Sequence, residues 1–152
     1  MADGRLMADP DFYHAVMDFY EVPLERPRRL LPAVNREDFR ARAASVTRVL
    51  ESLCLKGNKT ACAIYEEAAD ELALSVAAVL EQAEGTYPLL LSGGNLREGA
   101  PLLEMLLERL EGNERLERIA IPTVPAVRSA ASMALLAAGL EEAAERLMEQ
   151  EA

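Results

Sequence analysis

The stretch formed by Ser92, Gly93 and Gly94 could bring a phosphate group close to the backbone, because two adjacent glycines follow the apolar run at residues 87–91 after a single serine. Glycine has no Cβ, so a nucleotide can approach the main chain there. An amphipathic run at residues 102–110 follows, and the free N–H groups at a helix start favour anions. An ordinary turn that needs a positive φ explains the same glycines, since the GxGxxG and P-loop patterns are absent. On these residues alone, both interpretations stay open.

Two arginines, Arg97 close to these glycines and Arg128 further along the chain, carry the chemistry that phosphate or ribose oxygens would need. A guanidinium binds such oxygens with two parallel N–H groups, although a surface ion pair is the alternative for each arginine. His14 is the only histidine, so no second imidazole accompanies it as a metal ligand, and we expect a structural role. An acidic helical face is expected to be solvated rather than catalytic; its members are Glu66, Glu67, Asp70 and Glu71.

The two cysteines, Cys54 and Cys62, stand eight residues apart in alanine- and leucine-rich surroundings. This spacing is typical of neither a metal pair nor a disulfide framework. We therefore expect two buried free thiols. Nearby, Lys56 and Lys59 need no function beyond favourable charge at helix ends.

Capping residues divide the first half of the chain into helices. Asp9 with Pro10 predicts a helix start, Asn35 predicts another, and Gly57 followed by Asn58 predicts a helix end and a new start. The expected helices cover residues 10–20, 26–31, 35–55 and 59–83. The last of these should bury one stripe, formed by Ala61, Ala68, Leu72, Val76 and Val79.

In the second half of the chain, the spacing of apolar residues changes from a helical period to short continuous runs. Residues 87–91 and 116–122 are short apolar runs typical of buried strands, and the helix between them predicts a parallel pair with a right-handed crossover. A final helix should pack closely on a neighbour through a stripe of mostly small residues: Val127, Ala130, Ala131, Ala134, Leu135 and Ala138. Two strands make a poor sheet, so we expect other structure to cover their edges. The fold class is α/β, mostly helical, with a small parallel strand pair.

Composition narrows the function classes. The chain has 152 residues, of which 51% are hydrophobic, and this composition suits one folded domain. From the expected elements, the domain has a helical part at 1–85 and a strand-helix-strand-helix part at 86–152. A net charge of -10 disfavours binding to nucleic acid or anionic membranes. No apolar run approaches the roughly 18 residues of a membrane span, and the first ten residues do not form a secretory signal. We expect a cytoplasmic protein.

The chain resembles, in the stretches LLLSGGNLREGAPLLEMLLERL and RIAIPTVPAVRSAASMALL, the C-terminal part of the BadF/BadG/BcrA/BcrD ATPase family. This family includes N-acetylglucosamine kinases of the actin, sugar kinase and Hsp70 superfamily. Its Ser/Gly-Gly turn, which approaches adenosine and the α-phosphate, matches Ser92, Gly93 and Gly94. Its Pro-x-x-Gly-Ala-Ala-like segment matches Pro125 onward, with Ser129 where glycine is usual. Upstream, Gly57 and Asn58 resemble the family's Gly-Asp helix junction.

The resemblance implies the distal part of an actin-like, ribonuclease H-like ATPase lobe that binds ATP with Mg²⁺. The family's phosphate loops and catalytic acid are absent from this sequence. The resemblance therefore implies the nucleotide-binding half of a sugar kinase or ATPase, which is inactive without a further lobe. That further lobe would supply the Mg²⁺ ligands. A non-catalytic module that docks through a strand edge, or self-associates, is the alternative. The candidate nucleotide-binding residues are Ser92, Gly93, Gly94, Asn95, Arg97, Pro125, Arg128 and Ser129.

Overall fold

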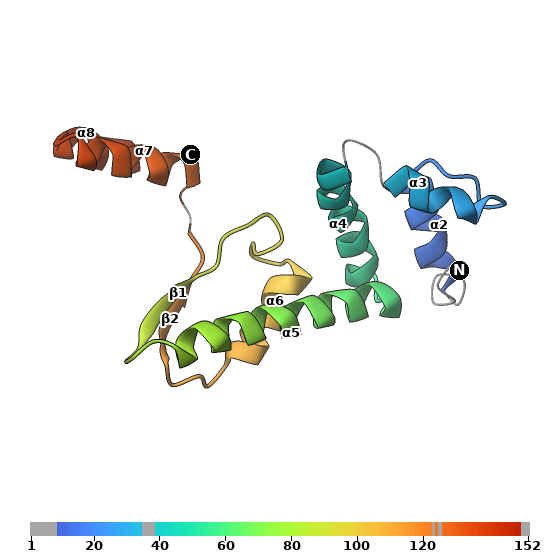
Figure 1. Ribbon diagram of the computed structural model, residues 1–152, viewed down its shortest axis with the longest axis horizontal. Helices are drawn as coiled ribbons and strands as arrows, with labels where there is room; N and C mark the ends of the chain where they lie inside the picture. Colours follow the sequence, from blue (N-terminus) through green and yellow to red (C-terminus); the bar gives the residue numbers. More distant parts are fainter. Residues whose placement is uncertain (1–8, 35–38, 123, 125, 150–152) are drawn as a thin grey trace. The chain divides into compact units, whose positions relative to one another are not determined.

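The computed structural model describes residues 9–34, 39–122, 124 and 126–149, and it is mostly helical with one small parallel sheet, as the sequence predicts (Figure 1). The chain divides into two compact units. The first unit lies within residues 1–85 and 93–115, and the second within residues 86–92 and 116–152. This division differs from the predicted subdivision at residue 85, because the helix between the strands groups with the N-terminal helices.

The first unit begins with helix α2 (Pro10–Phe19), whose predicted cap is confirmed: the Asp9 carboxylate accepts the Phe12 N–H at 3.0 Å. The predicted short helix is a 3-10 turn, η1 (Pro27–Arg29), that continues into α3 (Leu30–Val34). Helix α4 (Phe39–Leu55) follows. The predicted cap at Asn35 lies outside the described residues.

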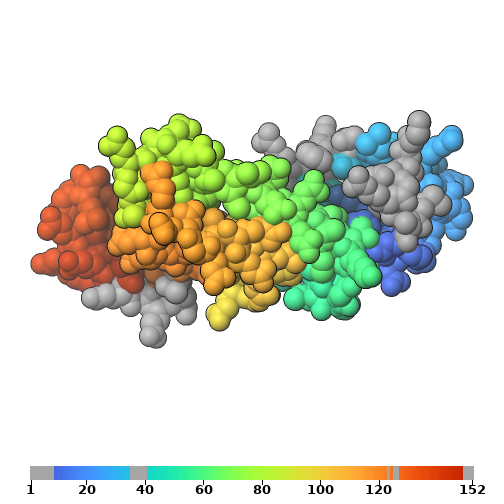
Figure 2. Space-filling model, turned by 90° about the horizontal axis from the view of Figure 1, so that it is seen from below, coloured from blue at the N-terminus to red at the C-terminus, as the bar shows by residue number. Residues whose placement is uncertain are grey.

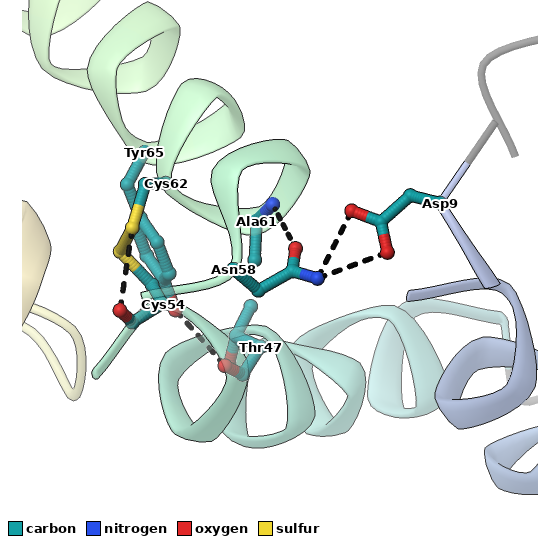
Figure 3. Close-up of a disulfide and its surroundings, with 7 residues drawn as sticks. All are labelled: Asp9, Thr47, Cys54, Asn58, Ala61, Cys62 and Tyr65. Carbon is teal, nitrogen blue, oxygen red and sulfur yellow. Dashed lines mark hydrogen bonds between the residues drawn. A yellow bond between two sulfur atoms is a disulfide. The ribbon is translucent and has the colours of Figure 1, made fainter. Parts of the chain in front are cut away.

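A tight junction connects α4 to α5 (Lys59–Glu81), as predicted. Gly57 has a φ of 83°, a conformation that favours glycine and that reverses the chain direction. Asn58 then caps α5, since its Oδ1 accepts the Ala61 N–H at 2.9 Å. The Asn58 amide also donates to both oxygens of Asp9 at 3.0 Å, so the caps of α2 and α5 are bonded to one another (Figure 3).

The expectation of two free thiols is wrong, because Cys54 and Cys62 form a disulfide (Figure 3). The reversal at Gly57 brings the end of α4 beside the start of α5, and the two Cα atoms lie 4.7 Å apart. That separation is within the range that a disulfide spans. A spacing of eight residues in a sequence does not reveal such a reversal, which is why the linear pattern was misleading.

Helix α6 (Pro101–Leu110) packs on α5, and Figure 2 shows this segment, in yellow to orange, against the green helices. Its predicted apolar face is confirmed, with Leu102, Leu103, Leu106 and Leu110 buried. The predicted stripe of α5 is only partly correct. Val79 is 67% exposed, and the buried residues are Ala61, Tyr65, Ala69 and Leu80. The alanine-rich helix has two apolar faces, and its neighbours α4 and α6 select the one that packs.

The second unit contains strands β1 (Tyr87–Leu90) and β2 (Leu116–Ala120), which pair in parallel with Leu89 opposite Ile119. The pairing confirms the prediction, but the expected burial of both strands is wrong. Leu90 is 66% exposed and Tyr87 is also exposed. Within the described part of the chain the sheet has two strands, so no further strand pairs with their outer edges.

The same unit ends in two helices, α7 (Ala126–Ala137) and α8 (Glu141–Glu149), which pack on each other across Gly139. The contact buries Ser132 and Ala144, and the Ser132 hydroxyl donates to the Ala144 carbonyl at 3.5 Å. The predicted small-residue stripe of α7 is therefore not its packed face, since Val127 is 77% exposed and the stripe's alanines are exposed as well. Ser132 lies outside that stripe, and α8 covers the face that carries it.

None of the helices described is both long enough and apolar enough to cross a membrane.

Candidate functional site

The backbone conformation of the turn after β1 distinguishes the two explanations for its glycines, a turn that needs a positive φ and the close approach of a ligand. Ser92, Gly93 and Gly94 are all exposed. Gly93 has a φ of 146°, which an L side chain rarely adopts, and its carbonyl accepts the Leu96 N–H at 3.0 Å. Gly94 has no such φ, and a Cβ built on it would meet no atom within 4 Å. Backbone geometry thus accounts for glycine at position 93, whereas nothing in the described chain requires glycine at position 94.

Arg97 ties this turn to helix α4. Its guanidinium forms an ion pair with the Glu51 carboxylate, so the ion-pair alternative is the contact that the structure contains. The Arg97 side chain stays 56% exposed, while that of Glu51 is 13% exposed. The pair therefore holds an otherwise solvated arginine at the surface of α4.

A cleft of about 490 Å³ lies where Arg97 meets α4. It is lined by Arg48, Glu51, Ser52, Leu55, Lys56 and Arg97. Three cations and one carboxylate face a volume that falls within the usual range for small-molecule sites. The cleft lies entirely within the first unit.

Sequence reasoning did not identify the α4 side of this cleft. Arg48 and Ser52 are four residues apart and thus share a helix face, but that spacing is common on solvated helices. The distinguishing fact is the contact between Glu51 and Arg97, which are 46 residues apart in sequence. Lys56, for which only helix-end electrostatics was expected, is part of the lining.

The charge of Glu51 also reaches helix α5. Burial is the main cause that raises the pKa of the Tyr65 hydroxyl, and the negative charge of Glu51 raises it further, against the opposing effect of Arg97. Tyr65 donates its hydroxyl proton to the Thr47 carbonyl at 2.9 Å. Glu51 therefore lies close to the buried contact between α4 and α5, with Arg97 on its outer side.

The predicted site residues are divided between the two units. Gly93, Gly94, Asn95 and Arg97 belong to the first, and Asn95 is half-buried. Ser92, Arg128 and Ser129 belong to the second, where Arg128 and Ser129 are half-buried on α7. Pro125 lies outside the described residues. The structure joins Arg97 of the first group to α4.

The structure gives the acidic face of α5 a structural role and places His14 at the surface. Asp70, on the acidic face of α5, accepts a hydrogen bond from Arg109, and this bond is the main cause that raises the Arg109 pKa. His14 lines a shallow surface cleft of about 540 Å³ beside Asp11 and Asp18. In the described ranges, no three histidine, cysteine or acidic side chains are grouped as metal ligands.

Comparisons with known proteins give no match: no family model, no curated protein and no solved structure is similar to this chain.

Proposed function

We propose that the chain is the nucleotide-binding half of an ATP-dependent sugar kinase or ATPase resembling N-acetylglucosamine kinase. The observation that carries the proposal is the cleft between α4 and the Gly93–Arg97 turn. Its lining carries the guanidinium groups of Arg48 and Arg97 and the ammonium group of Lys56, which are cations that bind phosphate oxygens. Gly93 and Gly94 are exposed and precede Arg97 in the chain, but they do not line the cleft. A ligand that approaches the backbone at Gly94 would also explain a glycine that the chain's own packing does not require.

Different lining residues suit different parts of a nucleotide. Arg48, Lys56 and Arg97 supply positive charge for phosphate oxygens. Glu51 can accept hydrogen bonds from ribose hydroxyls, and Ser52 can donate or accept one. Because Arg97 already contacts Glu51, bound phosphate would share the guanidinium with that carboxylate. This competition and the open cleft predict weak binding by the chain alone.

Phosphoryl transfer requires more than these residues. The reaction depends on positioning and on neutralisation of charge by Mg²⁺ and cations around the transferred group. The cleft supplies cations for the phosphates of a nucleotide, but the described residues contain no group of three or more histidine, cysteine or acidic side chains for the metal. In this proposal a further lobe supplies the Mg²⁺ ligands, the phosphate acceptor and the catalytic acid.

Calorimetric titration with Mg²⁺-ATP at millimolar concentration tests the proposal. We expect weak saturable binding that Arg97→Ala reduces by roughly 10-fold, because charge-assisted hydrogen bonds to phosphate are lost. Arg109→Ala is the matched control, since Arg109 is also paired with a carboxylate but does not line the cleft, and its affinity should equal that of the wild type. Absence of binding by the wild-type chain, or equal losses in both variants, contradicts the proposal.

A second candidate function is a non-catalytic module that docks through its strand edge or self-associates. The exposed Leu90 side chain of β1 favours it, because this leucine is 66% exposed on a two-stranded sheet. Size-exclusion chromatography with light scattering tests self-association. A chain that stays monomeric and folded up to high micromolar concentration contradicts a requirement for a second copy.

A further inference from the structure

Two cross-links, a disulfide and a hydrogen bond, hold helices α4 and α5 together at their junction (Figure 3). The disulfide joins Cys54 on α4 to Cys62 on α5. The hydrogen bond from the Tyr65 hydroxyl to the Thr47 carbonyl joins the same helices about two turns away along α4. Glu51 lies between Thr47 and Cys54 in α4, so both cross-links restrain the helix segment that holds Arg97.

The disulfide is anchored in the same helix end that lines the cleft, although neither cysteine is a lining residue. Cys54 lies between the lining residues Ser52 and Leu55, within the last turns of α4. The Cys54 carbonyl accepts the Gly57 N–H at 2.8 Å, so the bridged residue is part of the helix end itself. A change at Cys54 therefore acts directly on the backbone that presents Ser52, Leu55 and Lys56.

The two sulfurs differ in accessibility. Cys54 is buried, whereas Cys62 is half-buried, so Cys62 is the sulfur that an external thiol can reach more easily. Cys62 also lies at the end of the first turn of α5, three residues after Lys59. A helix N-terminus and a nearby cation both favour the thiolate, which is the reactive form.

We propose that the Cys54–Cys62 disulfide is a redox-operated clasp that sets the affinity of the cleft at Arg97 for nucleotide. The proposal rests on the proposed function, because it concerns the regulation of that same site. The closed clasp fixes the end of α4 and preorganises the cleft, and reduction releases this segment. Reduced protein should bind Mg²⁺-ATP about 5-fold more weakly, a typical coupling between two sites.

The clasp closes by thiol-disulfide exchange with a small disulfide such as oxidised glutathione. The Cys62 thiolate attacks one sulfur of glutathione disulfide, forming a mixed disulfide and releasing one glutathione. The Cys54 thiolate then attacks the Cys62 sulfur and releases the second glutathione. Two electrons pass from the cysteines to glutathione, and the two cysteine protons are taken up by the released thiolates.

The junction keeps other bonds when the disulfide opens. Gly57 still reverses the chain, Asn58 still caps α5 and donates to Asp9, and Tyr65 still donates to Thr47. The reduced protein should therefore stay folded, with its melting temperature lowered by roughly 5–10 °C through loss of a short covalent loop. A folded reduced state is what permits the bridge to act as a switch.

The test compares oxidised and dithiothreitol-reduced protein by amide hydrogen exchange and by Mg²⁺-ATP titration, with thiol counting to confirm each state. We expect faster exchange at residues 51–63 and also at residues 95–99 after reduction, together with the 5-fold loss of affinity. Cys62→Ser should match the reduced wild type under both conditions, and Cys54→Ala provides a second variant if Cys62→Ser folds poorly.

The outcomes separate the two proposals. Absence of ATP binding in both states contradicts the proposed function and, with it, the effect of the clasp on nucleotide affinity; faster exchange at 95–99 in that case would still show that the disulfide restrains this turn. ATP binding of equal strength in both states, with exchange changes confined to residues 54–62 or absent, overturns the clasp and leaves the proposed function supported. Two free thiols that glutathione disulfide cannot oxidise overturn the clasp as well.

Discussion

The two compact units differ in how much of their apolar surface is buried. The first unit has a continuous core drawn from α2, α4, α5 and α6, including the fully buried Met17 and Leu106. The described residues of the second unit that are buried are Leu91, Ser132 and Ala144. The first unit therefore has the means to fold on its own contacts, whereas the second resembles a sheet edge and a helix pair that need additional covering structure.

Hydrogen exchange should show the largest difference between the units. Amides of α5 and α6 should exchange only by global unfolding, while those of α7 and α8 should exchange at least roughly 100-fold faster, because helices with few buried contacts open locally. Mass spectrometry of peptides from 59–81, 101–110 and 126–149 measures both rates. Equal protection of the two units against exchange would contradict the difference in burial between them.

Truncation of leucine side chains should give the next largest effect. Leu106→Ala on α6 should lower the free energy of unfolding by about 2–5 kcal/mol, since the side chain is 1% exposed and its removal leaves a cavity. Leu90→Ala on β1 should lower it by less than about 0.5 kcal/mol, because that side chain is already in solvent. Urea denaturation of both variants provides the comparison. A large loss from Leu90→Ala would mean that β1 is covered in solution.

A smaller effect should come from the hydroxyl of Tyr65. Tyr65→Phe removes the hydrogen bond to the Thr47 carbonyl and should destabilise the first unit by about 1 kcal/mol. Tyr13→Phe is the control, since the Tyr13 hydroxyl donates to the Leu24 carbonyl at an exposed position where water can replace it. Urea midpoints measure both changes. If the two variants lose equal stability, burial does not strengthen the Tyr65 bond.

The smallest predicted effect is a pH dependence that originates in the first unit. Hydrogen bonds from Thr60 and Phe12 hold the pKa of Asp9 below its ordinary value of 3.8. A lowered folded pKa stabilises the protein above the unfolded value, and this stabilisation is lost as the pH falls below 3.8 and through the folded pKa. Asp9→Asn should therefore melt below the wild type at neutral pH, with the gap closing in acid.

The exposed pair Glu142–Arg146 on α8 supplies the control for this prediction. Glu142→Gln removes a fully solvated partner and should leave the melting temperature unchanged at every pH. Melting curves between about pH 7 and pH 2 measure both variants against the wild type. A constant gap for Asp9→Asn would mean that its hydrogen bonds, rather than its ionisation, carry the stabilisation.

Local signals in the sequence predicted most of the elements. The caps at Asp9 and Asn58, the glycine at 57 and the leucine spacing of residues 102–110 each act within one or two helical turns, and the structure confirms them. The strand pair followed from two apolar runs separated by a helix. These features need no knowledge of distant neighbours.

Contacts between distant segments were not predictable in the same way. Cys54 and Cys62 meet because Gly57 reverses the chain, and α5 buries Ala69 rather than Val79 because of where its neighbours lie. The candidate site shows the same limit. Arg97 was identified from its place beside the glycines, but Arg48, Glu51 and Ser52 join it through a contact that no local spacing encodes.

The bond between Asn58 and Asp9 has a consequence for how the chain acquires its helices. Starting a helix is the costly step, because several residues must be ordered before the first bonds repay that cost. Asp9 and Asn58 each cap their own helix and also hold each other across 49 positions of sequence. The first turns of α2 and α5 should therefore stabilise each other once the intervening chain brings them together, so that fraying of one helix start weakens the other.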